Sequence, residues 1–206
     1  MQFQYETKRL QLLVCNEEYA PALLSFMKNN KDFFAPYEPF REEAFYTEAF
    51  QAQVLRAEFQ AMLRHSYLRY YLFLKDQPEE IIGTVSFSNI SRTEDKSCHV
   101  GYKLSQAHTG QGYATEALTL LLSEVHKHLH IHRVEADILL ENTPSLRLIE
   151  RLGFTYEGVA RSSHEIRGVW RDHLRYSYIF PQNPCCRPHC GRPCKAHQGS
   201  GNSALC

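Results

Sequence analysis

The stretch that most constrains the fold of this chain is HTGQGYATEA, His108–Ala117, in which a single residue separates Gly110 from Gly112. Before it, Cys98–Leu104 alternates apolar and polar side chains, which is typical of a half-buried strand. After it, apolar residues recur at helical spacing as far as Leu129. A strand, a glycine loop and a helix N-terminus in this order predict an anion site. The N–H groups of the first helical turn have no partner within the helix, and the helix dipole adds partial positive charge.

The loop lacks the side chains of two common phosphate motifs. A nucleoside-triphosphate loop needs a lysine after its last glycine, and none lies here. The dinucleotide motif needs a third glycine or alanine where this chain has Thr115. What remains is a diphosphate bound by main-chain donors alone.

The rest of the chain predicts one α/β (α+β) domain with a mixed sheet. Further strands are expected at Arg9–Val14, Leu68–Lys75, Ile81–Asn89, Arg133–Leu139, Phe154–Arg167 and Asp172–Phe180, the last two forming a hairpin. One helix follows Asn16 as its cap, and a second is expected over Glu43–Arg64. The inward face of that second helix is expected to be Phe45, Ala49, Ala52, Phe59 and Leu63. A short helix is expected to begin with Thr143 as N-cap and to end at Gly153.

The composition changes at Pro181, so we expect a domain over residues 1–180 and a disordered Cys/Pro/Gly-rich tail over 181–206. Five of the seven cysteines lie in that tail. An odd count without an export signal argues against a disulfide scaffold. The tail spacings match no structural zinc motif, so no metal site is expected; a metal-binding module in the tail is the alternative, tested by zinc content.

Lysine plus arginine equals aspartate plus glutamate, 23 each, which does not favour a nucleic-acid or membrane-surface partner. No apolar run approaches the ~20 residues of a membrane helix. The first residues carry charges where a signal peptide needs an apolar core. We therefore expect an intracellular, cytoplasmic protein.

Three segments resemble one known family. TGQGYA, Thr109–Ala114, is similar to the pyrophosphate loop of the GNAT acyltransferases, Gln/Arg-x-x-Gly-x-Gly/Ala, except that Thr109 replaces the first residue. Glu141–Gly158 resembles the Asn-x-x-Ser … Leu-Gly-Phe-x-x-Glu-Gly segment of the RimJ/RimL group of ribosomal-protein alanine N-terminal acetyltransferases, and Gly168–Ser177 resembles that group's last hairpin. The resemblance covers Met1 to about Phe180. It implies a GNAT fold, with a mixed, largely antiparallel sheet splayed at its centre and helices on both faces.

The resemblance also implies a reaction, the direct transfer of an acetyl group from acetyl-CoA to an amine in a ternary complex. The strands that end near Leu104 and Leu139 would admit the pantetheine arm, and a main-chain amide near Val100–Tyr102 would polarise the thioester. The matching asparagine contacts that arm, and the matching serine, or a nearby tyrosine, can protonate the departing thiolate. The implied cofactor-binding residues are Leu104, Gly110, Gln111, Gly112, Tyr113, Ala114, Thr115, Asn142 and Ser145, and Ser145 is also the candidate acid.

Three residues are candidates for the general base. Counting from Ser145, His164 falls where some family members place a catalytic glutamate, and Glu165 follows it. Because neighbouring strand residues face opposite ways, only one of the two should face the cleft. His99 occupies the place where relatives often carry glutamate, and histidine titrates in the useful range. Each could instead be a solvated strand residue, and a water relay is a further alternative.

The acceptor implied by the resemblance is the α-amine of a protein N-terminus, possibly that of a ribosomal protein. A small-molecule amine, such as an antibiotic, polyamine or amino acid, is the enzymatic alternative, and a non-catalytic CoA-binding protein is the other. The aromatic segment Phe33–Phe40 either lines a peptide cleft or fastens a loop to the core. The protein is expected to be a monomer or a homodimer.

Overall fold

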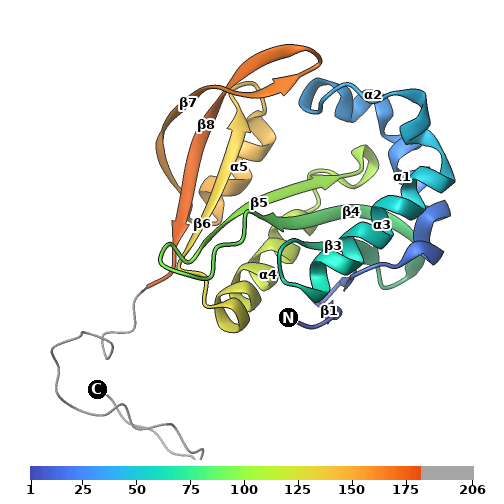
Figure 1. Ribbon diagram of the computed structural model, residues 1–206, viewed down its shortest axis with the longest axis horizontal. Coiled ribbons are helices and arrows are strands. Elements are labelled where there is room, and N and C mark those ends of the chain that lie inside the picture. The colour runs from blue at the N-terminus through green and yellow to red at the C-terminus, as the bar shows by residue number, and fades with distance from the viewer. Residues whose placement is uncertain (182–206) are drawn as a thin grey trace, which may run out of the picture.

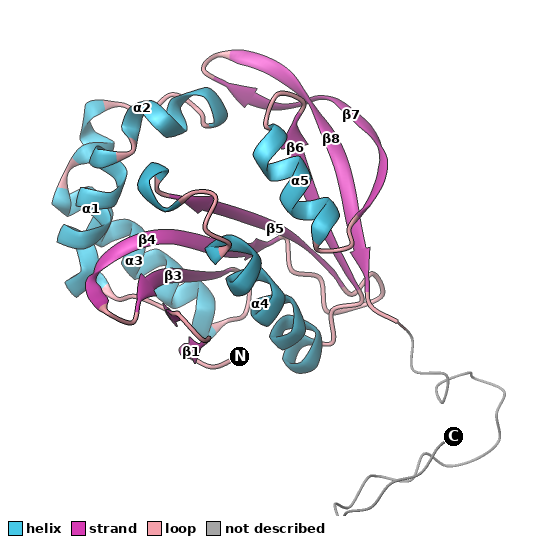
Figure 2. Ribbon diagram, turned by 180° about the vertical axis from the view of Figure 1, so that it is seen from behind, coloured by secondary structure: helices cyan, strands magenta, loops and turns pink. Residues whose placement is uncertain are grey.

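The computed structural model describes residues 1–181, and the predicted tail lies outside the described residues apart from Pro181. The described chain forms one eight-stranded sheet in the order β1-β2-β3-β4-β5-β6-β8-β7 (Figures 1 and 2). The strands are β1 (Gln4–Glu6), β2 (Leu10–Leu13), β3 (Leu68–Leu74), β4 (Gln77–Ser88), β5 (Ser97–Leu104), β6 (Arg133–Leu139), β7 (Thr155–Ile166) and β8 (Val169–Ile179). The short strand β1 was not predicted, and β4 begins four residues before the expected Ile81.

The sheet is divided at its centre. All neighbouring strands pair antiparallel except β5 and β6, which pair parallel. That parallel pairing covers only Ser97–His99 against Arg133–Glu135, and the two strands then diverge (Figure 1). This confirms the expected mixed, largely antiparallel, splayed sheet.

Helices cover both faces of the sheet, as expected (Figure 2). The helices are α1 (Ala20–Asn29), α2 (Lys31–Phe34), α3 (Glu48–Leu63), α4 (Tyr113–Leu129) and α5 (Thr143–Arg151). The apolar stripe of α4, Leu121 and Val125 among it, packs on one face in the main hydrophobic cluster. Residues of α1 and α3, including Leu23 and Leu55, pack with Phe73 on the opposite face.

The second predicted helix was wrong in its start and in its face. Glu43–Tyr46 forms a separate 3₁₀ turn, and Thr47 caps α3 by accepting a hydrogen bond from the Phe50 amide at 3.3 Å. Leu55 and Met62 are buried, whereas Leu63, expected to face inward, is 54% exposed. Both faces of this helix carry apolar residues, so periodicity alone does not select the buried one.

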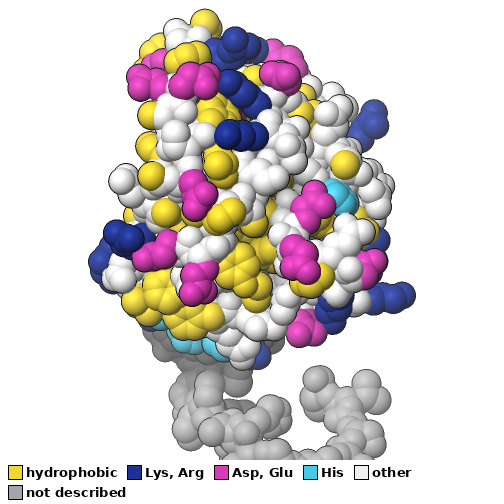
Figure 3. Space-filling model, turned by 90° about the vertical axis from the view of Figure 1, so that its right-hand side faces the viewer, with side chains coloured by type: hydrophobic (Ala, Val, Ile, Leu, Met, Phe, Trp, Pro, Cys, Tyr) yellow, Lys and Arg dark blue, Asp and Glu magenta, His cyan; other side chains and the backbone are white. Residues whose placement is uncertain are grey.

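Two smaller predictions are also corrected. The N-cap of α5 is Asn142, whose Oδ1 accepts a hydrogen bond from the Ser145 amide at 3.3 Å, and Thr143 is the first helical residue. The aromatic segment Phe33–Phe40 is not all loop, because α2 extends to Phe34. Within residues 1–181, no helix has the length and apolar character needed to cross a membrane. On the face in Figure 3, positive and negative side chains are interspersed.

Candidate active site

The glycine loop has the geometry of an anion site. Gly110 and Gly112 both lie in the left-handed region, with φ of +74° and +84°. Gly112 is the N-cap of α4, and no side chain caps this helix. The first-turn amides of Tyr113, Ala114 and Thr115 are therefore left for a ligand. The loop, including Gln111, fits a diphosphate bound by main-chain donors.

Arg9 holds this loop from outside, a contact that was not predicted. Its Nε donates to the Glu116 carboxylate at 2.8 Å, and its NH1 donates to the Gln111 carbonyl at 3.0 Å. Its guanidinium also lies 4.3 Å from the centre of the Tyr113 ring. Burial alone would raise the pKa of Glu116, but hydrogen bonds from Thr7 and Arg9 outweigh it and lower that pKa. Glu116, which has no assigned chemistry, is thus an anchor of the loop.

The divergence of β5 from β6 forms a fork with two distinct faces. Along β5, Cys98 and Val100 are buried in the cluster that contains α4, and Tyr102 packs against it. Because side chains alternate along a strand, His99 and Lys103 lie on the opposite face. Lys103 indeed lies with its ammonium 5.3 Å from the centre of the Phe34 ring. The candidate residues of β5 are therefore distributed over both faces of the fork.

On the α4 and α5 face, the structure connects β5 to α5. The Tyr102 hydroxyl donates to the Ser145 main-chain carbonyl at 3.2 Å. Burial raises the pKa of Tyr102 to about 12, so the phenol is protonated near neutral pH. Asn142 and Ser145, both predicted, thus lie at the fork beside a tyrosine that the sequence had not singled out. Leu104, half-buried, ends β5 beyond them.

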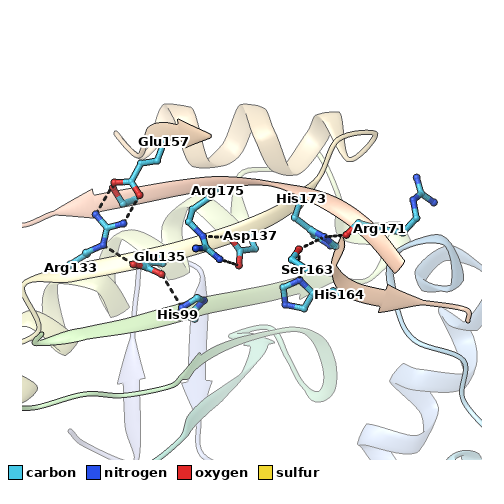
Figure 4. A network of polar contacts seen from close by, with 11 residues as sticks. His99, Arg133, Glu135, Asp137, Glu157, Ser163, His164, Arg171, His173 and Arg175 are labelled. Carbon is cyan, nitrogen blue, oxygen red and sulfur yellow. Dashed lines mark hydrogen bonds and ion pairs between the residues drawn. The ribbon is translucent and has the colours of Figure 1, made fainter. Parts of the chain in front are cut away.

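On the opposite face, His99 pairs with a carboxylate. Its Nε2 lies 2.9 Å from Oε2 of Glu135, at the last paired position before the fork. Arg133 donates through Nε to the other oxygen of Glu135 at 2.7 Å and also binds Glu157 (Figure 4). The Arg133 hydrogen bond is the main reason that the pKa of Glu157 falls to about 2. His99 therefore lies at the end of a row of paired polar side chains, His99, Glu135, Arg133 and Glu157, called the polar row below.

The structure separates the other two candidate bases. His164 is exposed, but its Nδ1 lies 3.1 Å from Ser163 Oγ, and its ring stacks edge-on with His173 at 4.6 Å (Figure 4). Burial lowers the pKa of His173. Glu165 is exposed and opposes Trp170 on β8. Of the two neighbours, His164 is the one that contacts other polar side chains, those of Ser163 and His173.

A cavity of about 330 Å³ lies further along on the same side. The segment from Phe34 to Arg41 and Arg167 of the β7–β8 turn contribute to its lining. Glu38 of that segment pairs with Lys103, which fastens the segment to β5. Burial lowers the pKa of Lys103 more than the Glu38 charge raises it. The aromatic segment thus both packs on the core through Phe34 and borders a cavity.

No group of three His, Cys, Asp or Glu side chains among residues 1–181 could hold a metal ion. The cysteines and histidines of the tail lie outside the described residues. In the described part, Cys15 and Cys98 are buried free thiols, and burial raises the pKa of Cys98 to about 12. Neither cysteine forms part of the site.

Comparison with known proteins gives a consistent family. Residues 9–155 match the family model described as an acetyltransferase (GNAT) domain. The chain is 35% identical over 177 residues to the ribosomal protein uS5-alanine N-acetyltransferase of Escherichia coli (strain K12), covering 85% of this chain and 90% of the relative.

Solved structures agree. The ribosomal-protein-S5-alanine acetyltransferase from Vibrio fischeri is similar with a TM-score of 0.81 and 29% identity, over 86% of this chain and 97% of that chain. RimJ of Mycobacterium smegmatis, solved in complex with CoA-disulfide, is similar with a TM-score of 0.77 and 25% identity, over 82% of this chain and 81% of that chain.

Proposed function

The chain belongs to the GNAT acetyltransferase family, and we propose that it transfers the acetyl group of acetyl-CoA to the α-amine of a protein N-terminus. The observation that carries this proposal is the distribution of polar groups at the fork. The Tyr102 hydroxyl, which can protonate a thiolate, lies on one face in contact with the Ser145 main chain, and a histidine that can accept a proton lies on the other. This arrangement suits direct transfer from donor to acceptor, with the acetyl group held between the faces.

Acetyl-CoA is the acyl donor and enters from the α4 and α5 face. The amides of Gly110–Thr115 bind its pyrophosphate, with Gln111 in the middle of the loop held by Arg9. The pantetheine arm runs into the fork past Leu104, with Asn142 as its polar contact. Main-chain N–H groups of β5 that face β6 beyond His99 have no ladder partner there, and one of them polarises the thioester carbonyl.

The acceptor amine enters from the face that carries His99. Its nitrogen attacks the thioester carbon, the C–S bond breaks, and the thiolate takes a proton from the Ser145 or Tyr102 hydroxyl. A free thiol has a pKa of ~8.5, so this acid contributes modestly, about 100-fold. His99 accepts the proton that the amine loses, with His164 and Glu165 as the other candidates.

The α-amine is favoured over lysine by the strength of base that each requires. An α-amine has a pKa near 8 and lysine near 10.4, so an imidazole suffices for the first and is weak for the second. The Escherichia coli relative is named for an alanine N-terminus of a ribosomal protein, which supports a ribosomal acceptor and the cytoplasm as the compartment. The cavity beside Arg167 lies where the following acceptor residues would pass.

The test is the rate of CoA release with a panel of acceptors. Peptides with a free α-amine should release CoA, and the same peptides with a blocked N-terminus and an internal lysine should release at least ten times less. Free amino acids and polyamines form the third arm. Faster release with those small amines would replace this proposal with a small-molecule acetyltransferase.

A further inference from the structure

The His99–Glu135 pair lies where β5 and β6 separate, unlike the Arg133–Glu157 pair of the same row. Register places the two residues opposite each other at the last parallel contact of β5 and β6, so the strands separate immediately beyond them. The side chains are 32% and 19% exposed, which leaves the imidazole accessible while its partner is mostly covered.

The Glu135 carboxylate has little freedom to turn. One oxygen faces His99 Nε2 at 2.9 Å, and the other accepts from Arg133 Nε at 2.7 Å. Arg133 is itself bound to Glu157, which also accepts from the Ser177 hydroxyl at 2.7 Å. Both oxygens of Glu135 therefore have assigned partners, and the row extends across β6, β7 and β8 (Figure 4).

The hydrogen bond determines which ring nitrogen of His99 carries the hydrogen. An ionised carboxylate only accepts, so Nε2 must donate, and in the neutral ring Nδ1 then has a free lone pair. We propose that Glu135 is the positioning residue of the general base, holding His99 in the tautomer whose Nδ1 accepts the proton of the acceptor amine. This inference rests on the proposed function.

The step balances with the groups present. The ammonium gives one proton to His99 Nδ1, and the neutral amine forms the N–C bond as the C–S bond breaks. The new amide nitrogen then loses its second proton, which returns through water to the Ser145 or Tyr102 hydroxyl that protonated the thiolate. The imidazolium gains its positive charge beside Glu135, and the row then reads positive, negative, positive, negative from His99 to Glu157. The imidazolium finally releases its proton to water.

His164 lacks a partner that fixes its tautomer in this way among the contacts of the described residues. The Arg171 carbonyl only accepts, so His173 Nδ1, 3.2 Å away, carries a hydrogen. Ser163 Oγ lies 3.0 Å from the same nitrogen and 3.1 Å from His164 Nδ1, and its hydroxyl can either donate to or accept from the His164 ring. The Ser163 hydroxyl is therefore compatible with either tautomer of His164, whereas the Glu135 carboxylate selects one tautomer of His99.

The chain supplies a matched control. On α4, His128 Nε2 lies 3.1 Å from Glu124 Oε2, with side chains 31% and 14% exposed. This pair has the same chemistry and similar burial, and it lies near the end of α4 opposite to the glycine loop. Glu124→Gln therefore measures the effect of breaking a His–Glu pair away from the fork.

The experiment combines histidine ¹⁵N NMR with steady-state kinetics on the full chain. The His99 signals are those lost in His99→Gln. We expect wild-type His99 to be protonated at Nε2 only. Glu135→Gln should remove that preference and lower kcat about 10- to 100-fold, which is no more than a general base typically contributes to the rate. KM for acetyl-CoA should stay unchanged, and Glu124→Gln should match wild type in both readouts.

Two results would overturn the inference while leaving the proposed function in place. One is a wild-type His99 protonated at Nδ1, which needs no variant to fold. The other is an active wild type whose kcat changes no more in Glu135→Gln than in Glu124→Gln. If wild-type protein acetylates no α-amine while CoA still binds, the proposed function fails, and the role of Glu135 fails with it.

Discussion

Replacing either loop glycine by alanine tests the anion site most sharply. Gly110 and Gly112 have φ of +74° and +84°, where a residue with a Cβ costs about 1–2 kcal/mol. A Cβ at Gly110 would meet no atom within 4 Å, and one at Gly112 would lie 3.5 Å from Arg9, an ordinary contact. The predicted cost is therefore backbone strain with no steric addition.

This strain divides between folding and binding. If the loop keeps its conformation without ligand, the free energy of unfolding falls by about 1–2 kcal/mol. If the exposed loop relaxes, the same strain returns on binding and raises the dissociation constant of CoA about 5- to 30-fold, since 1.4 kcal/mol corresponds to about tenfold. The two losses, expressed as free energies, should sum to about 1–2 kcal/mol for each variant.

The assay is isothermal titration with CoA together with urea unfolding. Gly168→Ala is the control, because Gly168 has φ of +80° with no atom within 4 Å of its Cβ position and lies in the β7–β8 turn. It should lose unfolding free energy and leave CoA affinity unchanged. A summed loss below about 0.5 kcal/mol for Gly110→Ala and Gly112→Ala, or an equal loss of CoA affinity in Gly168→Ala, would refute the reasoning.

Three further predictions concern the fork and the polar row. Tyr102→Phe should lower kcat about 10- to 100-fold in steady-state assays. Ser145→Ala removes the serine hydroxyl but keeps the main-chain carbonyl that Tyr102 binds, so comparing kcat of the two variants identifies the hydroxyl that protonates the thiolate. Asn142→Ala should lower the free energy of unfolding in urea by about 1 kcal/mol through loss of the α5 cap. Stability should fall in two acid windows, because lowered pKa values mean that the folded state binds fewer protons. The stability that neutral His173 contributes is complete above pH 6.5 and is lost as the pH falls below that value. The stability that ionised Glu157 contributes is lost between pH 4.5 and about pH 2. Urea unfolding of His173→Gln across this pH range checks this, because the variant should lose only the fall in stability below pH 6.5.

Local signals in the sequence predicted the parts of the fold that local physics determines. The glycine loop, the apolar stripe of α4 and the β7–β8 hairpin depend on backbone conformation and periodicity within a few residues. Helix α3 was predicted with the wrong face because apolar residues surround it, and Phe59 stacks on Phe3, 5.5 Å away, rather than entering the core.

The contacts that organise the site join residues far apart in the chain. Arg9 and Glu116 are 107 positions apart, and Tyr102 and Ser145 are 43 apart. Nothing in the neighbourhood of Glu135 distinguishes it from a solvated strand residue, since its role follows from the register of β5 against β6. The sequence thus placed His99 among the candidates but did not indicate which carboxylate holds it.

The most direct test of N-terminal acetylation is mass spectrometry of a mixture of peptides with free α-amines and internal lysines, incubated with the protein and acetyl-CoA. We predict acetyl groups on α-amines only, and the preferred first residue will indicate the natural target. Acetylated lysines, or no acetylated peptide in a sample that still binds acetyl-CoA, would contradict the proposed function.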